Sequence, residues 1–170
     1  MPAPVAVRRA AALGLRVTSA LSFLAPLLTR LVIGYAFFQA GGGKIANFDN
    51  TVSFFTDLGI PFPALNAAFI ARLEFYGGLL LIVGLGTRVV AALLGSTMVV
   101  ALMTAHRQEL IDIFKGVSES GLTDVVPVVY GLFLLWLMLF GPGLASLDAL
   151  VRKWIAPRPD AAKEADRLAV

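Results

Sequence analysis

Four apolar stretches dominate this chain, and their lengths restrict it to one class of fold. They cover about residues 21–42, 66–85, 89–105 and 124–140. A helix needs about 20 mostly apolar residues to cross the hydrocarbon core of a bilayer, and it satisfies its backbone hydrogen bonds within itself. The sequence therefore predicts an all-α integral membrane protein, built as an antiparallel four-helix bundle.

The composition agrees with a membrane setting. Of the 170 residues, 58% are hydrophobic and 15% are charged, whereas a soluble domain carries about 25% charged residues. The chain contains no cysteine and one histidine, His106. It therefore lacks its own ligands for disulfides, iron–sulfur clusters or bis-histidine haem. We expect no metal site and no catalytic residues in this chain.

The chain divides into four regions. Residues 1–20 form a basic amino-terminal segment, 21–143 a transmembrane domain, 144–155 an interfacial helix and 156–170 a mobile tail. The first apolar stretch is too long for the core of a signal peptide, so we expect it to remain as an uncleaved helix.

The basic residues predict the topology. The net charge is +3, and the basic residues gather toward the two ends of the chain. This distribution does not suggest a nucleic-acid partner. If the amino terminus is cytoplasmic, nine basic residues lie inside and three outside, so both termini are predicted to be cytoplasmic. The inner set is Arg8, Arg9, Arg16, Arg88, Arg152, Lys153, Arg158, Lys163 and Arg167, and the outer set is Lys44, Arg107 and Lys115.

Residues 144–155 have the pattern of an amphipathic helix. Leu147, Leu150, Val151, Trp154 and Ile155 share one helical face. Such a helix lies in the plane of the interface, where tryptophan and basic side chains act as anchors. We therefore predict an interfacial helix anchored by Trp154, Arg152 and Lys153.

Glycines mark the expected helix contacts, because small residues let membrane helices approach closely. The run Gly41-Gly42-Gly43 before Lys44 also predicts the end of the first helix. The predicted packing positions are Gly34, Gly41, Gly77, Gly78 and Gly84.

Two charged residues inside the spans define a candidate site. Arg30 shares a helical face with Gly34, and Glu74 shares one with Gly77 and Gly78. A charge within a span faces the bundle or extends to the interface, so we expect Arg30 and Glu74 to pair inside the bundle. Glu74 could instead contact a quinone, a lipid or another polar molecule, or carry a proton. The candidate site comprises Arg30, Gln39, Glu74 and Tyr76.

Three segments together resemble the DoxX family of small four-helix membrane proteins. They are Arg30-x-x-x-Gly34-x-x-Phe37-x-x-x-Gly41-x-x-Lys44, Phe54-x-x-x-x-Gly59-x-Pro61-x-Pro63 and Glu74-x-x-Gly77-Gly78-x-x-Leu81-x-x-Gly84-x-x-Thr87-Arg88. The resemblance covers the first half of the chain, and the last two spans match by hydropathy alone. It implies a multi-pass protein of a bacterial-type cytoplasmic (inner) membrane.

The resemblance also implies an association with membrane redox systems, either quinone-linked or active in oxidative stress. We expect a non-catalytic subunit or anchor, embedded in the lipid bilayer beside an oxidoreductase or other complex subunits, with quinone as the implied ligand. A small-molecule or proton carrier that uses the buried Arg–Glu site is one alternative, and a membrane assembly scaffold is another. The sequence leaves a homo-oligomer open.

Overall fold

The computed structural model describes residues 14–16, 18–19 and 21–155, and its regular elements are helices throughout this part of the chain. They are α2 (Leu24–Ala46), α3 (Phe48–Asp57), α4 (Pro63–Val83), α5 (Thr87–Met103), α6 (Arg107–Phe114), α7 (Val126–Phe140) and α8 (Leu147–Ile155). The all-α prediction is confirmed. The predictions for residues 1–13 and the tail 156–170 fall outside the described residues.

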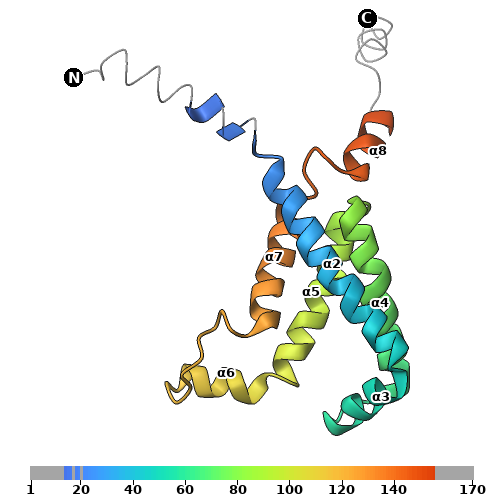
Figure 1. Cartoon of the computed structure of the whole chain (residues 1–170), viewed down its shortest axis with the longest axis vertical. Coiled ribbons are helices and arrows are strands. Elements are labelled where there is room, and N and C mark those ends of the chain that lie inside the picture. The colour runs from blue at the N-terminus through green and yellow to red at the C-terminus, as the bar shows by residue number, and fades with distance from the viewer. Residues whose placement is uncertain (1–13, 17, 20, 156–170) are drawn as a thin grey trace, which may run out of the picture.

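Two of these helices, α2 and α4, are long and apolar enough to cross a membrane. The pair α5 and α6 would be a third span if counted as one helix bent by 70°, and α7 is a shorter apolar helix. Figure 1 shows α8 near the start of α2, and α3 and α6 at the opposite end of the molecule. We call these the α8 end and the α3 end.

Glycines let α2 and α4 pack closely. A Cβ atom added to Gly34 would lie 2.8 Å from the carbonyl oxygen of Gly78, and one added to Gly41 would lie 2.7 Å from that of Ala71. Side-chain atoms do not fit in such gaps, so the two backbones are in direct contact. Because higher numbers on α2 meet lower numbers on α4, these two helices run in opposite directions.

The core draws residues from four helices. Its buried members are Ile33 and Phe37 of α2, Leu81 of α4, Val90, Ala91 and Leu94 of α5, and Leu134 and Leu137 of α7. On α2 and α4 the buried residues recur at helical spacing, as the sequence predicted.

The first helix ends four residues later than predicted. Gly41, Gly42 and Gly43 stay helical, and α2 continues through Lys44 to Ala46 before the chain turns at Asn47. Glycine permits a helix end without requiring one, and Gly41 serves instead as a contact with α4. The ends predicted at residues 140 and 155 agree with α7 and α8, and the other bounds shift by two or three residues. The helix α6 occupies part of what was predicted as a loop.

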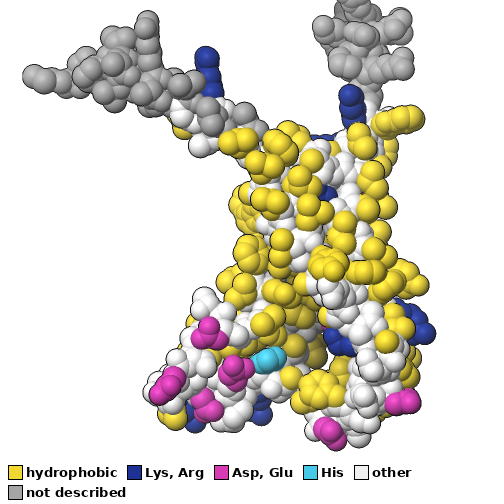
Figure 2. All heavy atoms as spheres, in the orientation of Figure 1, with side chains coloured by type: hydrophobic (Ala, Val, Ile, Leu, Met, Phe, Trp, Pro, Cys, Tyr) yellow, Lys and Arg dark blue, Asp and Glu magenta, His cyan; other side chains and the backbone are white. Residues whose placement is uncertain are grey.

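The surface is divided along the long axis of the molecule. Hydrophobic side chains cover the middle of the face shown in Figure 2, while acidic side chains gather at the α3 end over α3, α6 and the loop that follows. These acids are Asp49, Asp57, Glu109, Asp112, Glu119 and Asp124. An apolar belt with a polar end matches a protein embedded in a bilayer.

Candidate functional site

Glu74 forms an ion pair with Lys44. The Lys44 ammonium donates to Oε2 of Glu74 between α4 and the last turn of α2. The Glu74 side chain is 5% exposed and that of Lys44 is 30% exposed. A buried carboxylate needs such a partner, because its desolvation is costly.

The predicted contact between Arg30 and Glu74 is therefore wrong. The glycine contacts place Glu74 near the level of Gly41 on α2, because Gly41 meets Ala71 and Phe75. Arg30 lies eleven residues before Gly41, or about 16 Å along a helix. The error follows from ending the first helix at Gly42, which placed Lys44 in a loop.

Arg30 lies instead in a polar cluster at the α8 end. Its side chain is fully buried, and Nη2 donates to the carbonyl oxygen of Ala145. Nη1 lies against Gly84, in the space that a Cβ atom would occupy. Nε and Nη1 of Arg30 have no hydrogen-bond partner among the described residues, nor does the buried Oγ1 of Thr87.

Asp148 at the start of α8 bonds to the turn beside this cluster, and no local sequence pattern indicated this role. Its carboxylate accepts hydrogen bonds from the backbone N–H groups of Gly86 at 2.7 Å and Thr87 at 2.9 Å. Its own N–H donates to the carbonyl oxygen of Gly84 at 2.9 Å. Asp148 thus caps the start of α5, although 61 residues separate it from Thr87. We call these three hydrogen bonds the Asp148 clamp.

The other residues of the family motif lie at helix ends and turns. Gly59 follows α3 with φ of 69°. The Pro61 carbonyl oxygen accepts a hydrogen bond from the side-chain amide of Asn66, and Pro63 begins α4. Thr87 begins α5, with Arg88 next to it. Within the described part of the chain, none of these residues forms a hydrogen bond or ion pair with the side chains of Lys44 and Glu74.

The remaining two members of the predicted site lie on the outside. Gln39 is exposed on α2. Tyr76 is 59% exposed and lines a groove of about 500 Å³ between α4 and α5, together with Arg72. The rest of this lining is apolar or glycine: Leu65, Ala68, Phe69, Leu73, Gly77, Leu80, Val90 and Leu93. The structure therefore separates the four predicted residues into four different environments.

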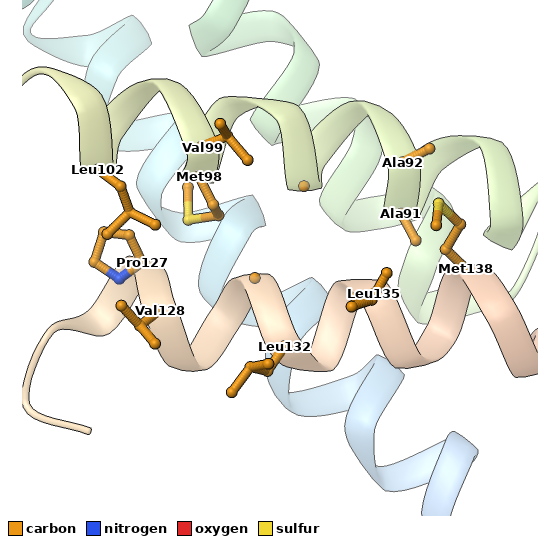
Figure 3. Close-up of a pocket in the computed structure, with 12 residues that line it drawn as sticks. Ala91, Ala92, Met98, Val99, Leu102, Pro127, Val128, Leu132, Leu135 and Met138 are labelled. Atoms are coloured by element: carbon orange, nitrogen blue, oxygen red, sulfur yellow. The ribbon is translucent and has the colours of Figure 1, made fainter. Parts of the chain in front are cut away.

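A second groove, of about 400 Å³, lies between α5 and α7 (Figure 3). Its lining is apolar throughout, with Met98 and Leu102 on α5 facing Pro127 and Val128 on α7. With no polar side chain in its lining, this groove offers no fixed orientation to a ligand with a polar group.

The predicted packing and anchor positions can also be placed. A Cβ atom on Gly77 would lie 3.2 Å from the Leu94 side chain, so this glycine faces α5. Trp154 is 88% exposed near the end of α8, with Arg152 and Lys153 beside it. The interfacial position of α8 stays a prediction.

Within the described residues no group of three histidine, cysteine, aspartate or glutamate side chains is placed to hold a metal ion. The site is thus two buried polar clusters, at Glu74 and at Arg30, and one exposed groove with polar side chains at Arg72 and Tyr76. The two clusters are buried within the protein, whereas the groove is exposed.

Comparison with known proteins gives consistent matches. A profile of the DoxX family matches residues 25–107. The chain is 31% identical over 123 residues to "Inner membrane protein YphA" of Escherichia coli (strain K12), covering 72% of this chain and 86% of the relative. It is 29% identical over 129 residues to "Inner membrane protein YqjF" of the same organism, covering 75% and 93%.

A third relative is "Putative oxidoreductase CatD" of Bacillus subtilis (strain 168), 37% identical over 78 residues. This match covers 46% of the chain and 57% of the length of CatD. No solved structure matches the chain.

Proposed function

Because this chain belongs to the DoxX family of membrane proteins, we propose that it is a non-catalytic membrane subunit that supplies a quinone-binding groove to a redox partner. The observation that carries the proposal is the α4–α5 groove, where Arg72 and Tyr76 are the polar side chains of an otherwise apolar lining. Its volume of about 500 Å³ lies within the range of small-molecule sites.

The two polar residues are suitably placed for a quinone. Arg72 and Tyr76 are four residues apart on α4, so their side chains lie on one helical face. Nη1 of Arg72 donates to the carbonyl oxygen of Ala68 at 3.0 Å, one turn toward the α3 end. The guanidinium has further N–H donors, and the tyrosine hydroxyl supplies another. A quinone carbonyl accepts such bonds, while its isoprenoid tail suits the apolar walls.

A redox role requires a partner for electron transfer. The chain has no cysteine and one histidine, so it carries no cysteine-ligated cluster or bis-histidine haem. The name of CatD describes an oxidoreductase, which supports a redox setting for its relatives. The alternative of a carrier using Arg30 and Glu74 gains no support, since neither residue lines the grooves described above.

The proposed arrangement in the membrane is an antiparallel bundle of α2, α4, α5 and α7, with the α8 end on the cytoplasmic side. The basic residues Arg88, Arg152 and Lys153 lie on α5 and α8 at that end, and the acidic residues lie at the other. This distribution follows the preference of Lys and Arg for cytoplasmic loops. The position of Trp154 on α8 supports contact of that helix with the inner interface.

The quinone proposal predicts that Tyr76→Phe weakens quinone binding by roughly tenfold, because one hydrogen bond of about 1 to 1.5 kcal/mol is lost. The change keeps the ring, which packs edge-on against Phe75 at 5.3 Å between centroids. Binding of decylubiquinone and of a short-chain menaquinone to the purified full chain is measured by equilibrium dialysis in detergent.

Tyr35→Phe is the matched control for this measurement. Tyr35 is 56% exposed on α2 and lies outside the lining of the α4–α5 groove. Tyr35→Phe makes the same chemical change as Tyr76→Phe, but on another exposed helix surface. Its quinone affinity should therefore stay within twofold of wild type. Equal losses in both variants, or no saturable binding to the wild type, would contradict the proposed function.

The topology proposal predicts that single cysteines at positions 47 and 163 react from opposite sides of the membrane. Asn47 lies between α2 and α3 at the α3 end, and position 163 follows α8 in the sequence. A membrane-impermeant maleimide added to intact cells should label N47C, and K163C should label only after the cells are opened. Labelling of both cysteines from the same side contradicts the proposed orientation.

A further inference from the structure

A third cavity, of about 410 Å³, lies at the α8 end of the molecule. It is formed where the first turn of α5, the end of α7 and the start of α8 meet. We call it the α8 pocket. It differs from the other two grooves in that charged side chains of both signs line it, namely Arg88, Arg152 and Asp148.

The two arginines are available to a ligand. Both oxygens of Asp148 are held by the backbone N–H groups of Gly86 and Thr87 in the Asp148 clamp. The side chains of Arg88 and Arg152 make no hydrogen bond or ion pair to another residue in the part of the chain that the structure describes. The guanidinium of Arg88 lies beside Gly141, where a Cβ atom would be 3.2 Å from Nε. The pocket thus offers two guanidinium groups beside one carboxylate already satisfied by hydrogen bonds.

The α8 pocket also has large apolar side chains in its lining. Val89, Phe140 and Leu144 line it, and they are 66%, 72% and 74% exposed. Exposed apolar side chains that gather around a cavity are a common feature of ligand-binding grooves. The pocket is therefore amphiphilic, because both charged and apolar side chains line it.

We propose that the α8 pocket binds one anionic phospholipid. Arg88 and Arg152 hold the phosphate through charge-assisted hydrogen bonds, for which the planar guanidinium is well suited. Val89, Phe140 and Leu144 contact the glycerol and the first part of an acyl chain. Basic pockets between helices on the cytoplasmic side of membrane proteins are suited to anionic headgroups. A free phosphate would use the arginines but would leave Val89, Phe140 and Leu144 uncovered.

The full chain in detergent is titrated with phosphatidylglycerol and, separately, with phosphatidylcholine, and bound lipid is counted by native mass spectrometry. We expect one phosphatidylglycerol per chain to bind at least about tenfold more tightly than phosphatidylcholine. In the double variant Arg88→Gln/Arg152→Gln this preference should disappear, because both charge-assisted bonds are lost.

The control is Arg107→Gln/Lys115→Gln, which also removes two positive charges, but at the α3 end of the molecule. It should bind phosphatidylglycerol like the wild type. Equal losses in both double variants would indicate general charge attraction and overturn the proposal, as would equal affinity of the wild type for the two lipids. Displacement of phosphatidylglycerol by an equal concentration of inorganic phosphate would overturn the lipid assignment. If the arginine double variant does not fold, Arg152→Gln alone, an exposed change on α8, should lower the affinity severalfold.

Discussion

Replacing Gly41 by alanine is expected to remove most of the folded protein, whereas replacing Gly43, two residues further along α2, should leave its amount unchanged. A Cβ atom at Gly41 would overlap the backbone nitrogen of Phe75 and lie 2.7 Å from the carbonyl oxygen of Ala71. These are backbone atoms of α4, so the clash cannot be relieved by rotating a side chain. Overpacking of this kind costs about 1–3 kcal/mol or more.

Gly43→Ala isolates the clash from other effects of the substitution. No atom lies within 4 Å of the Cβ position at Gly43, and both glycines are inside α2. Alanine favours a helix over glycine by about 1 kcal/mol at either position, so only the contact with α4 differs. The amount of protein in the membrane fraction and the midpoint of thermal unfolding in detergent are measured. Equal midpoints for the two variants would contradict the packing of α2 on α4.

Lys44→Met is expected to destabilise the protein by about 3 kcal/mol, because it leaves the Glu74 carboxylate buried without its partner. This is the low end of the range for breaking a buried ion pair, since the Lys44 side chain is 30% exposed. Glu74→Gln removes the charge together with the need for a partner. The double variant Lys44→Met/Glu74→Gln should therefore be more stable than Lys44→Met alone.

A second double-mutant cycle serves as the control. Arg30→Met and Glu74→Gln should have additive effects, because Arg30 lies in the cluster at the α8 end and makes its hydrogen bond to Ala145. Unfolding by denaturant in detergent gives the free energies for both cycles. Coupling between Arg30 and Glu74 together with additivity between Lys44 and Glu74 would show that the ion pair is assigned to the wrong cation.

The sequence predicted the helical class, the buried faces and the close contacts of α2 and α4, because these depend on local spacing. Gly34, Gly41, Gly77 and Gly78 all lie buried where helical periodicity placed them. The partner of Glu74 was missed because one helix end was misplaced by four residues. Both Lys44 and Glu74 belonged to the family motif, so their joint occurrence was the signal that could have paired them.

The cluster around Arg30 could not be predicted in the same way. Its hydrogen bond to Ala145 joins residues 115 positions apart, and the Asp148 clamp joins α8 to a turn that precedes α5. Contacts between residues so far apart in the sequence depend on how the helices assemble, and no local sequence pattern encodes that assembly. The amphipathic pattern of residues 144–155 indicated a helix but gave no position for Asp148 relative to the turn.

The Asp148 clamp has a mechanical consequence for the two halves of the chain. Gly84 and Gly86 both have positive φ, 72° and 60°, and two glycines in so short a turn would ordinarily form a hinge between α4 and α5. The clamp bonds three successive points of that turn, at Gly84, Gly86 and Thr87, to a single residue of α8. These hydrogen bonds restrain the turn, and the angle between α4 and α5 is fixed for as long as Asp148 stays bonded to it. Large movements of this protein should therefore begin at the 70° bend between α5 and α6, where no such restraint is present among the described residues.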